Sequence, residues 1–323
     1  MHDPLVGPPF AAEPLRYRLG FAVRPVGNPA LRTHDGRRQG AHLSVSLIYL
    51  RDILHYMERI GVTCYRVASD ILPLDGAAFA QLADCAAELD LIADQVQACG
   101  VRLSMHLPIG LGLGSSDGAV GAKSMLAIEG YTTLLARLQG EVRAGSLVAH
   151  IGGAAQPETF DRFIARYTAL STQARAQLVI EHEGSGISLG HLLRLHLRCG
   201  VPIVFDRLHW QLFNPEHLPE SLALGFAFAT WPSHARPKVH LSSARSEAHL
   251  IPPRGNEPAR ILPPRYGQHA DFVQTSDLQQ LLTAAVALPA FDIMIEARAA
   301  DLALQRLRTE LAQQKKRNGS DFA

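Results

Sequence analysis

Six short apolar runs in this chain each end on a side chain that can bind a metal ion. The runs are RLSMH to His106, SLVAH to His150, LVIE to Glu181, PIVFD to Asp206, KVH to His240 and DIMIE to Glu296. Their continuous Val, Ile and Leu content is typical of parallel strands that are buried on both faces. Because parallel strands bring their carboxyl ends to one side of a sheet, we expect the six side chains to converge there.

The residue types in this set predict a site for divalent cations. Imidazole and carboxylate groups together are ligands of Mn²⁺, Zn²⁺ and Fe²⁺. Six such groups exceed the needs of one ion, and the carboxylates of Glu181 and Glu296 can bridge two. Two ions about 4 Å apart can activate a water molecule and stabilise the leaving oxygen of a phosphodiester. The alternative, that these are satisfied core or rim residues, explains single members more easily than the whole set.

Alternating strand and helix patterns position these residues. The strands are expected at 18–23, 64–68, 102–106, 146–151, 178–183, 202–206, 237–242 and 291–296. Amphipathic segments predict helices at 46–60, 78–98, 122–139, 158–176, 189–199, 216–230, 276–288 and 300–316. Eight βα units in this order predict an α/β protein with a single (β/α)8 TIM barrel and its metal site at the carboxyl face of the strands. A doubly wound sheet would need fewer strands or a second domain.

Length and composition fit one barrel domain. The 323 residues, 47% of them hydrophobic, suit an α/β barrel with an insertion. We expect the barrel at 17–316, between a flexible tail at 1–16 and a C-terminal tail at 317–323. The net charge of +1 gives the whole chain no strong nucleic-acid signature. Without a signal-peptide pattern or a long apolar run, and with four cysteines lacking metal-type spacing, the chain is expected to be cytoplasmic, with no membrane contact.

Two longer segments interrupt the alternation, at about 24–45 and 243–274. Both follow barrel strands and therefore belong to the face that carries the strand ends. Both contain several arginines, including Arg24 and Arg245, so a nearly neutral chain can still present a basic face. These arginines can bind phosphates or simply solvate the loops.

Seven stretches of sequence carry a resemblance to a known family. They are YRVASDILP (65–73), RLSMH (102–106), HIGG (150–153), VPIVFDRLH (201–209), KVHLS (238–242), HADFV (269–273) and DIMIEA (292–297). In this order and spacing, over about residues 18–310, the chain resembles the UV damage endonucleases, which are metal-dependent barrel nucleases. The resemblance implies a monomer that nicks damaged double-stranded DNA on the 5′ side of the damaged nucleotide.

Carried over residue by residue, the family's metal ligands fall on His106, His150, Glu181, Asp206, His209, His240, His269 and Glu296. The resemblance therefore adds His209 and His269, which the strand pattern does not select. It implies two or three divalent ions, Mn²⁺ before Zn²⁺ or Fe²⁺, and catalytic roles for Glu181, Glu296 and Lys238. Lys238 matches the family's lysine beside the metal cluster, where a modified or charged lysine can touch the reacting phosphate.

The chain departs from the family at the segment that reads DNA damage. After the histidine of strand three the family usually has HPGQ and an aromatic residue, which wedge into the duplex, whereas here HLPIG places Ile109 and Gly110 at those positions. Trp210 stands where a second histidine is common, and it can offer a stacking surface or pack under the adjoining loop. With Arg24, Arg207 and Arg245 it forms the predicted substrate-binding set. The departure bears on the substrate and leaves the metal site intact.

Two other functions are compatible with the sequence. One is a metal-dependent barrel enzyme, such as an isomerase or oxygenase, that acts on a small molecule or peptide; the altered HLPIG turn and the near-neutral charge favour it. The other is a metal-binding module without catalysis, which the completeness of the ligand set disfavours. The fold cannot decide, because barrels support unrelated chemistries.

Overall fold

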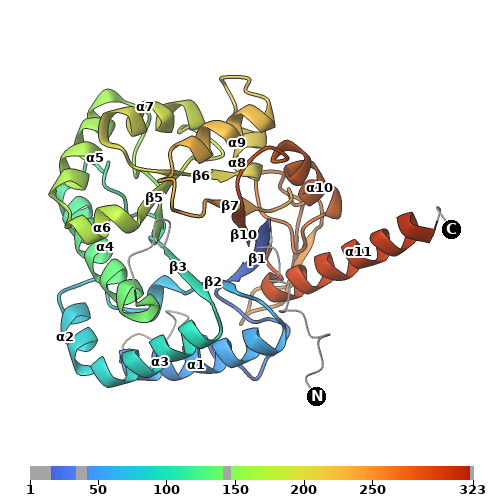
Figure 1. Cartoon of the computed structure of the whole chain (residues 1–323), viewed down its shortest axis with the longest axis horizontal. Helices are drawn as coiled ribbons and strands as arrows, with labels where there is room; N and C mark the ends of the chain where they lie inside the picture. The colour runs from blue at the N-terminus through green and yellow to red at the C-terminus, as the bar shows by residue number, and fades with distance from the viewer. Residues whose placement is uncertain (1–15, 34–41, 141–146, 321–323) are drawn as a thin grey trace, which may run out of the picture.

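Eight parallel strands close into a barrel surrounded by helices (Figure 1). This computed structural model describes residues 16–33, 42–140 and 147–320. Around the ring the strands follow the order β1, β10, β7, β6, β5, β4, β3 and β2, and β2 pairs with β1. Their bounds are β1 (Tyr17–Ala22), β2 (Cys64–Arg66), β3 (Arg102–His106), β4 (Leu147–Ala149), β5 (Leu178–Glu181), β6 (Ile203–Asp206), β7 (Lys238–Leu241) and β10 (Phe291–Ile295). The predicted (β/α)8 barrel is confirmed, with a strand at each of the eight expected places.

Helices follow the strands on the outside of the barrel. They are α1 (Leu43–Arg59), α2 (Ala77–Asp84), α3 (Ala86–Ala98), α4 (Gly118–Gln139), α5 (Pro157–Ala169), α6 (Thr172–Gln177), α7 (Leu189–Cys199), α8 (Arg207–Leu212), α9 (Glu220–Ala229), α10 (Thr275–Ala284) and α11 (Ala300–Ser320), with a short 3-10 turn at Ser69–Ile71. Two helices that were predicted as continuous are divided. One breaks at Cys85, where ψ is 24°, and the other at Leu170, where ψ is 156°. The Ser171 hydroxyl then accepts a hydrogen bond from the Ala174 amide and starts α6.

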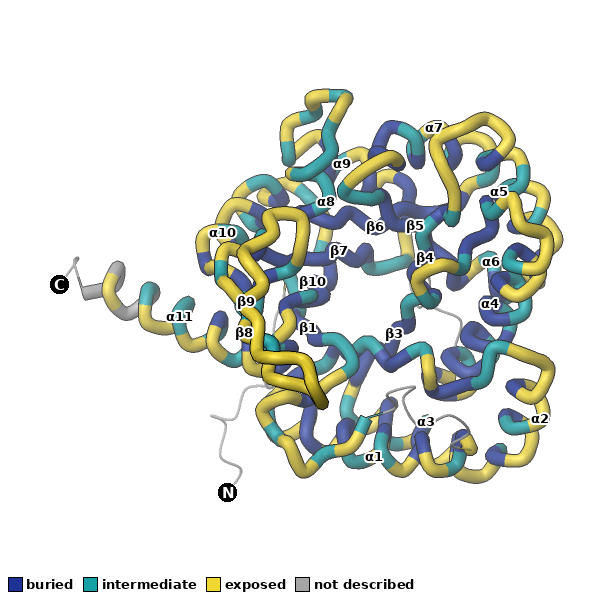
Figure 2. Tube along the Cα trace, turned by 180° about the vertical axis from the view of Figure 1, so that it is seen from behind, coloured by how far each residue is buried: buried dark blue, intermediate teal, exposed yellow. Residues whose placement is uncertain are grey.

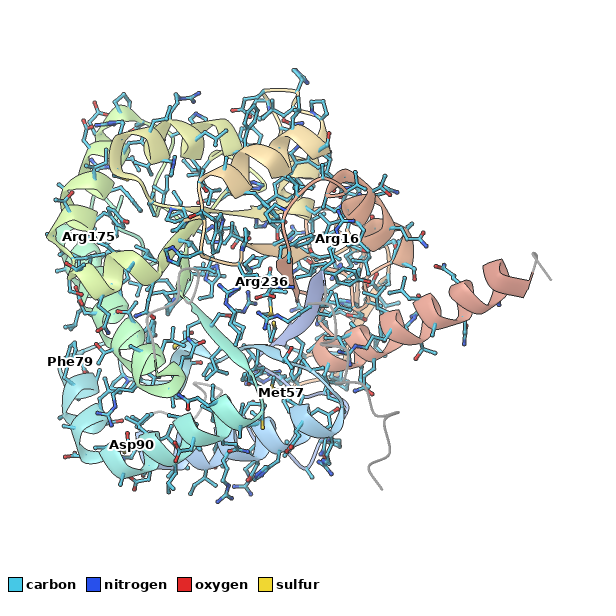
Figure 3. The ribbon with its side chains drawn as sticks, viewed as in Figure 1. Arg16, Met57, Phe79, Asp90, Arg175 and Arg236 are labelled. Atoms are coloured by element: carbon cyan, nitrogen blue, oxygen red, sulfur yellow. The ribbon has the colours of Figure 1, made fainter. Side chains whose placement is uncertain are left out.

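The break at Cys85 also changes which side chains are buried. The α1 residues with helical apolar spacing, such as Leu47, Leu50 and Leu54, are buried against the barrel as that spacing predicts. One continuous helix at 78–98 would place Phe79 on its inward apolar stripe, but Phe79 is 40% exposed. It lies on the outer side of the molecule, as Figure 3 shows for Phe79 and Asp90. The stripe is interrupted because α2 and α3 are separate helices, so the helical period does not continue across the break.

One layer of the barrel interior is ionic rather than apolar. The Asp292 carboxylate accepts hydrogen bonds from Arg18 (2.7 and 2.8 Å), Arg102 (2.6 Å) and Arg236 (2.8 Å). Figure 3 shows Arg236 near the middle of the barrel. Lys238 lies beside Asp292 in the parallel register of β7 and β10. A buried carboxylate is tolerated here because several donors satisfy its oxygens.

The segment predicted as a long loop at 243–274 contains an antiparallel hairpin. Its strands are β8 (His249–Ile251) and β9 (Arg260–Leu262), and each ends directly before a proline pair. Proline has no backbone N–H to donate, which accounts for the short strands. We call residues 244–269 the β7 arm, because this segment leaves the barrel after β7. Figure 2 shows the hairpin as an exposed segment in front of β1 and β10.

The predicted tails fall largely outside the described part of the chain. Residues 1–15 and 321–323 are not described, whereas Arg16 donates a hydrogen bond to the Ala285 carbonyl (2.5 Å). Helix α11 continues to Ser320, so it overlaps the tail predicted at 317–323. Among the helices in the described ranges, none has both the length and the apolar character needed to span a bilayer.

Candidate metal centre

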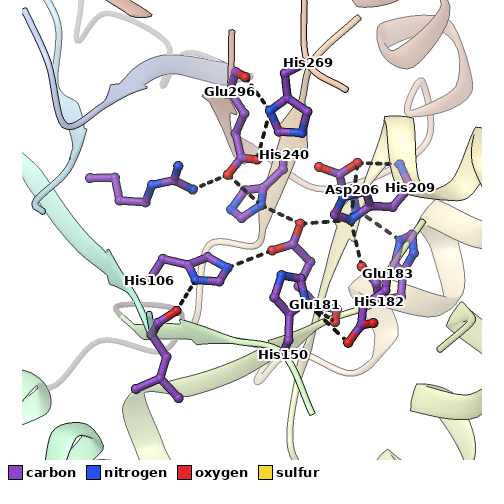
Figure 4. Close-up of polar contacts among 12 residues, drawn as sticks. His106, His150, Glu181, His182, Glu183, Asp206, His209, His240, His269 and Glu296 are labelled. Carbon is purple, nitrogen blue, oxygen red and sulfur yellow. Dashed lines mark hydrogen bonds and ion pairs between the residues drawn. The ribbon is translucent and has the colours of Figure 1, made fainter. Parts of the chain in front are cut away.

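The eight predicted metal ligands converge at the carboxyl ends of the barrel strands (Figure 4). Six of them lie at, next to or directly after the last residue of a strand: His106, His150, Glu181, Asp206, His240 and Glu296. The other two come from connecting segments. Asp206 accepts a hydrogen bond from the His209 amide (2.6 Å) and thereby starts α8, a helix that the sequence pattern did not predict. His269 closes the β7 arm. Neither residue is at the end of a strand, which is why strand patterns alone could not select it.

Glu181 lies at the centre of this group. Its Oε2 is 3.2 Å from His106 Nε2, and its Oε1 is 3.0 Å from His240 Nδ1 and 3.4 Å from His209 Nδ1. The side chain is almost fully buried. One carboxylate therefore reaches imidazoles from three different segments, which is the placement expected of a bridging ligand.

Backbone carbonyls fix the orientation of four of the histidine rings. Their Nδ1 atoms face carbonyl oxygens in the pairs His106–Leu107 (2.7 Å), His269–Glu296 (2.7 Å), His209–His182 (2.9 Å) and His150–Glu181 (3.4 Å). A carbonyl only accepts hydrogen bonds, so each Nδ1 must carry the proton. In the neutral ring the Nε2 lone pair is then left for a metal ion. Such support from outside the ligand set is the usual way in which proteins orient histidine ligands.

Several buried polar atoms at the centre have no hydrogen-bond partner within the described residues. They are Glu181 Oε1, Asp206 Oδ2 and both ring nitrogens of His240; the 3.0 Å contact between Glu181 Oε1 and His240 Nδ1 does not have the geometry of a hydrogen bond. Unsatisfied polar atoms in a buried site are costly unless a ligand satisfies them. The potential ligand atoms form two groups, and within each group they lie within 4.8 Å of one another. The groups are His106, His150 and Glu181, and Glu181, Asp206, His240 and Glu296. These residues fit divalent cations, and Glu181 belongs to both groups.

The carboxylates need protons or cations to balance their charge. Burial opposes protonation of His209, but the Asp206 and Glu181 carboxylates outweigh burial and raise its pKa to about 9. Burial raises the pKa of Asp206 to about 6. Protons held in this way compete with a cation, so metal binding at this centre must weaken as the pH falls.

Arg66 and His182 complete the centre, although the predicted ligand set contains neither of them. Arg66, the last residue of β2, forms an ion pair with Glu296. Burial would raise the pKa of Glu296, but the Arg66 guanidinium and His240 hold it at about 2, so this ligand stays ionised. A search of the strand ends for basic side chains as well as for metal ligands would have found Arg66.

His182 faces away from the barrel interior, as its alternation with Glu181 predicts. Its Nε2 accepts a hydrogen bond from the Asp206 amide (3.1 Å), and its carbonyl accepts from His209 Nδ1 (2.9 Å). Burial lowers the pKa of His182 to about 3, so the ring stays neutral and able to accept. His182 therefore positions two ligands without belonging to the set.

Lys238 lies deeper in the barrel than the ligand set. It is two residues before His240 in β7 and therefore shares its interior face, one layer further down. The side chain is fully buried, and burial together with Arg102 holds the pKa of its amine well below the usual range. Lys238 thus borders both the ionic layer and the metal centre, and its catalytic role stays a prediction.

A separate group is formed by Glu247 and His249 of the β7 arm and by Asp271 just beyond it, and its potential ligand atoms also lie within 4.8 Å of one another. The guanidinium groups of Arg245 and Arg298 lie 2.9 and 2.5 Å from His249 Nδ1. Because arginine only donates, Nδ1 must accept, and in a neutral ring the proton then occupies Nε2. The nitrogen that faces the two carboxylates is therefore protonated, which disfavours a cation at this position.

The structure buries two of the four predicted substrate-binding residues and half-buries a third. Arg207 is buried, and its guanidinium donates to Glu220, Asp277 and Gln280. Arg245 is also buried and donates to the Pro263 carbonyl (2.6 Å). The Trp210 indole donates to the Leu218 carbonyl (3.2 Å), which places the ring under the adjoining loop. The guanidinium groups of Arg207 and Arg245 are therefore occupied by contacts within the chain, whereas Trp210 is half-buried and Arg24, which follows β1, is exposed.

The fold and the site together define a class, (β/α)8-barrel proteins with a His/Asp/Glu metal-binding constellation at the carboxyl face of the strands. Residues 37–320 match the family described as UV-endonuclease UvdE. The chain therefore belongs to this family, and the resemblance noted from its sequence is confirmed.

Individual relatives agree with this assignment. The UV DNA damage endonuclease of Bacillus mycoides (strain KBAB4) is 26% identical over 268 residues, which are 80% of this chain and 78% of that protein. The crystal structure of SacUVDE superposes with a TM-score of 0.74 at 21% identity and covers 93% of this chain and 99% of its own. Endonuclease IV from Thermus thermophilus gives a TM-score of 0.59 at 15% identity, covering 92% and 99%. At these identities the structural likenesses establish the fold.

Proposed function

We propose that this protein is a metal-dependent endonuclease that hydrolyses a phosphodiester bond on the 5′ side of a damaged nucleotide in duplex DNA. The observation that carries the proposal is the sharing of Glu181 by two groups of ligand atoms in a member of this family. The mixed imidazole and carboxylate donors suit two or three divalent ions, with Mn²⁺ preferred and Zn²⁺ or Fe²⁺ as alternatives. A monomeric state and a cytoplasmic location also remain predictions.

The residues of the centre have different roles in this proposal. Divalent cations at such a site supply an activated water molecule and stabilise the charge that develops on the phosphate. Glu181 and Glu296 hold the cations, and Arg66 keeps Glu296 ionised. His182 and the backbone carbonyls keep the imidazoles aimed inward, so little rearrangement is needed before the reaction.

Nicking of irradiated plasmid is the direct test of this function. With added Mn²⁺ we expect the protein to convert UV-irradiated supercoiled plasmid to the open form and to leave undamaged plasmid largely intact. Addition of EDTA should stop the reaction, and metal analysis of the same sample shows whether the centre was loaded. A fully loaded protein that leaves irradiated DNA intact would contradict the proposal and favour the small-molecule enzyme instead.

In this proposal Ile109 is the side chain that recognises the damaged site in the DNA. Its side chain is 97% exposed in the loop after β3. The loop is held close to the next one, because a Cβ atom on Gly112 would lie only 2.5 Å from the Gly152 Cα, and the Gly114 amide donates to the Ile151 carbonyl (2.7 Å). Isoleucine is among the apolar side chains that proteins insert between base steps. One such side chain on a well-held loop can serve as a wedge.

We therefore expect Ile109→Ser to reduce the preference for irradiated over undamaged plasmid by about tenfold, because the contact that replaces lost base stacking is removed. Metal content should not change. Leu197→Ser is the matched control, since Leu197 is 83% exposed on the distant helix α7. An aromatic residue is best introduced as Ile109→Tyr, because Gly110 has a φ of +92° that a side chain would strain. An unchanged preference in Ile109→Ser would exclude the wedge.

A further inference from the structure

Backbone hydrogen bonds join the base of the β7 arm to the metal centre. Its base is closed by antiparallel contacts: the Arg245 amide donates to the Gln268 carbonyl (2.8 Å), and the Ala270 amide donates to the Ser243 carbonyl (2.9 Å). Ala244 and His269 form a bridge within this base. Because His269 is one of the eight predicted ligands, the arm begins at the centre itself.

Arginine contacts hold the hairpin of the arm against the barrel. The Arg245 guanidinium donates both to the Pro263 carbonyl (2.6 Å) and to His249 Nδ1 (2.9 Å), and so connects the two sides of the hairpin. Arg298, which follows β10, donates to the same nitrogen (2.5 Å). His249 and its neighbours thus fasten one face of the hairpin to the rim of the barrel.

The opposite face of the hairpin is apolar and exposed. Leu250 and Ile261 are direct partners in the β8–β9 register, so their side chains share a face, and each is 70% exposed. Tyr266, just beyond β9, is 66% exposed. Figure 2 shows these residues' segment as a nearly continuous exposed stretch beside the barrel opening. Exposed apolar side chains that gather in this way, with polar groups around them, mark surfaces that bind a partner.

The charge on the arm identifies the kind of partner. Residues 249–267 contain three arginines, Arg254, Arg260 and Arg265, and a single acidic residue, Glu257. All three arginines are exposed. The segment therefore carries an excess of two positive charges in a chain whose total is only +1. Arginines beside the centre are suited to a polyanion, since phosphate contacts supply most of the affinity of proteins for nucleic acid.

We propose that the β7 arm grips duplex DNA next to the metal centre. Arg254 and Arg265 contact backbone phosphates beside the Leu250–Ile261 face, which rests against the edge of the groove. The exposed Arg260, which shares the face of its partner Ile251, contacts a phosphate on the other side of the hairpin. This inference depends on the proposed function, because it assigns to the arm the DNA that flanks the bond to be cleaved. The contacts at the base hold the arm in place before binding, which reduces the ordering cost and fixes the register of the backbone against the centre.

The test compares two triple variants in which equal charge is removed. The arm variant is Arg254→Ala, Arg260→Ala and Arg265→Ala. The control is Arg51→Ala, Arg137→Ala and Arg198→Ala, at exposed positions on α1, α4 and α7. Affinity for an undamaged duplex is measured across a salt series by fluorescence anisotropy. We expect the arm variant to lose about tenfold or more in affinity at low salt and to flatten the slope of log K against log salt by about two to three, whereas the control keeps the wild-type slope.

A second variant tests the apolar face. Leu250→Ser with Ile261→Ser should weaken binding and leave the salt slope unchanged, because no phosphate contact is lost. Both side chains are exposed, so the barrel core is unaffected. Metal content should stay at the wild-type level in the arm variants, since the ligands themselves are intact.

The possible outcomes separate this inference from the proposed function. If the wild-type protein nicks irradiated plasmid and the arm variant binds duplex with unchanged affinity and slope, the arm does not hold DNA and only the inference fails. If the wild-type protein neither binds nor nicks DNA, both fail. If the variants change the sedimentation of the protein and not its DNA affinity, the arm serves a protein contact or a second copy of the chain, which also overturns the inference.

Discussion

Glu181→Gln is expected to remove bound metal from the centre and to lower nicking on the order of a thousandfold. Loss of a residue that merely supports a ligand costs about 10- to 100-fold in metal affinity or activity, and loss of a ligand shared by two groups must cost more. Glutamine has the same shape and keeps one oxygen near His106, His209 and His240, but it lacks the negative charge that a divalent cation requires of this ligand. Elemental analysis and plasmid nicking with Mn²⁺ give the two readouts.

Two controls make the result specific. Circular dichroism should show a folded barrel, because Glu181 lies at the end of β5 and not among the apolar residues of the core. Glu158→Gln, at an exposed position in the first turn of α5, removes the same charge away from the centre and should keep both metal and activity. A Glu181→Gln protein with the full wild-type complement of metal would contradict the shared site.

Asp292→Asn is expected to reduce the free energy of unfolding by about 3–5 kcal/mol at neutral pH, the usual cost of removing one partner from a buried ionic group. The substitution leaves Arg18, Arg102 and Arg236 without the carboxylate that accepts their hydrogen bonds. Arg102 is only 5% exposed, so water cannot replace the lost partner. Denaturant unfolding with a common slope for both proteins measures the loss.

The same carboxylate predicts a dependence of stability on pH. Burial would raise the pKa of Asp292, but the Arg18 and Arg102 guanidiniums overcome burial and lower it to about 2, below the ordinary 3.8. A carboxyl group whose pKa is lower in the folded chain than in the unfolded chain stabilises the fold at pH values above its unfolded pKa. This stabilisation, about 2 kcal/mol, is lost as the pH falls from about 4 towards 2. Asp292→Asn should lack this component, so its difference from the wild type shrinks in that window.

Asp161→Asn is the comparison for Asp292→Asn. Asp161 is paired with Arg198 on the surface, where the two side chains are 62% and 49% exposed. Exposed pairs of this kind contribute about 0–1 kcal/mol. If Asp292→Asn cost no more than Asp161→Asn, the ionic layer would not stabilise the barrel.

The two substitutions probe adjoining layers of one barrel. The lower layer, around Asp292, has an excess of guanidinium groups, whereas carboxylates crowd the upper layer around Glu181. Arg66 adds a guanidinium to the upper layer by pairing with Glu296. Positive charge below the centre favours the ionised form of the carboxylates above it, and ionised carboxylates are what a divalent cation requires.

The sequence by itself determined the barrel and most of the predicted metal centre. Periodic apolar runs locate parallel strands, and in a closed parallel sheet the last residue of every strand must lie on one face. His106, Glu181 and Asp206 could therefore be brought together before any coordinates were known. The family resemblance was needed to identify His209 and His269 as ligands, because α8 and the β7 arm do not have the apolar pattern of a barrel strand.

Only the tertiary structure decided which partners the charged side chains meet. Arg207 and Arg245 carry the charge that a phosphate-binding residue needs. In the folded chain, however, Arg207 pairs with Asp277, 70 residues further on, and Arg245 donates to the Pro263 carbonyl within the β7 arm. The protonated nitrogen of each histidine, the ionic layer around Asp292 and the pairing of Leu250 with Ile261 likewise depend on contacts between distant segments. The alternation of side chains along a strand shows which face a residue occupies. Its hydrogen-bond partner, however, depends on which distant residue the folded chain places next to it.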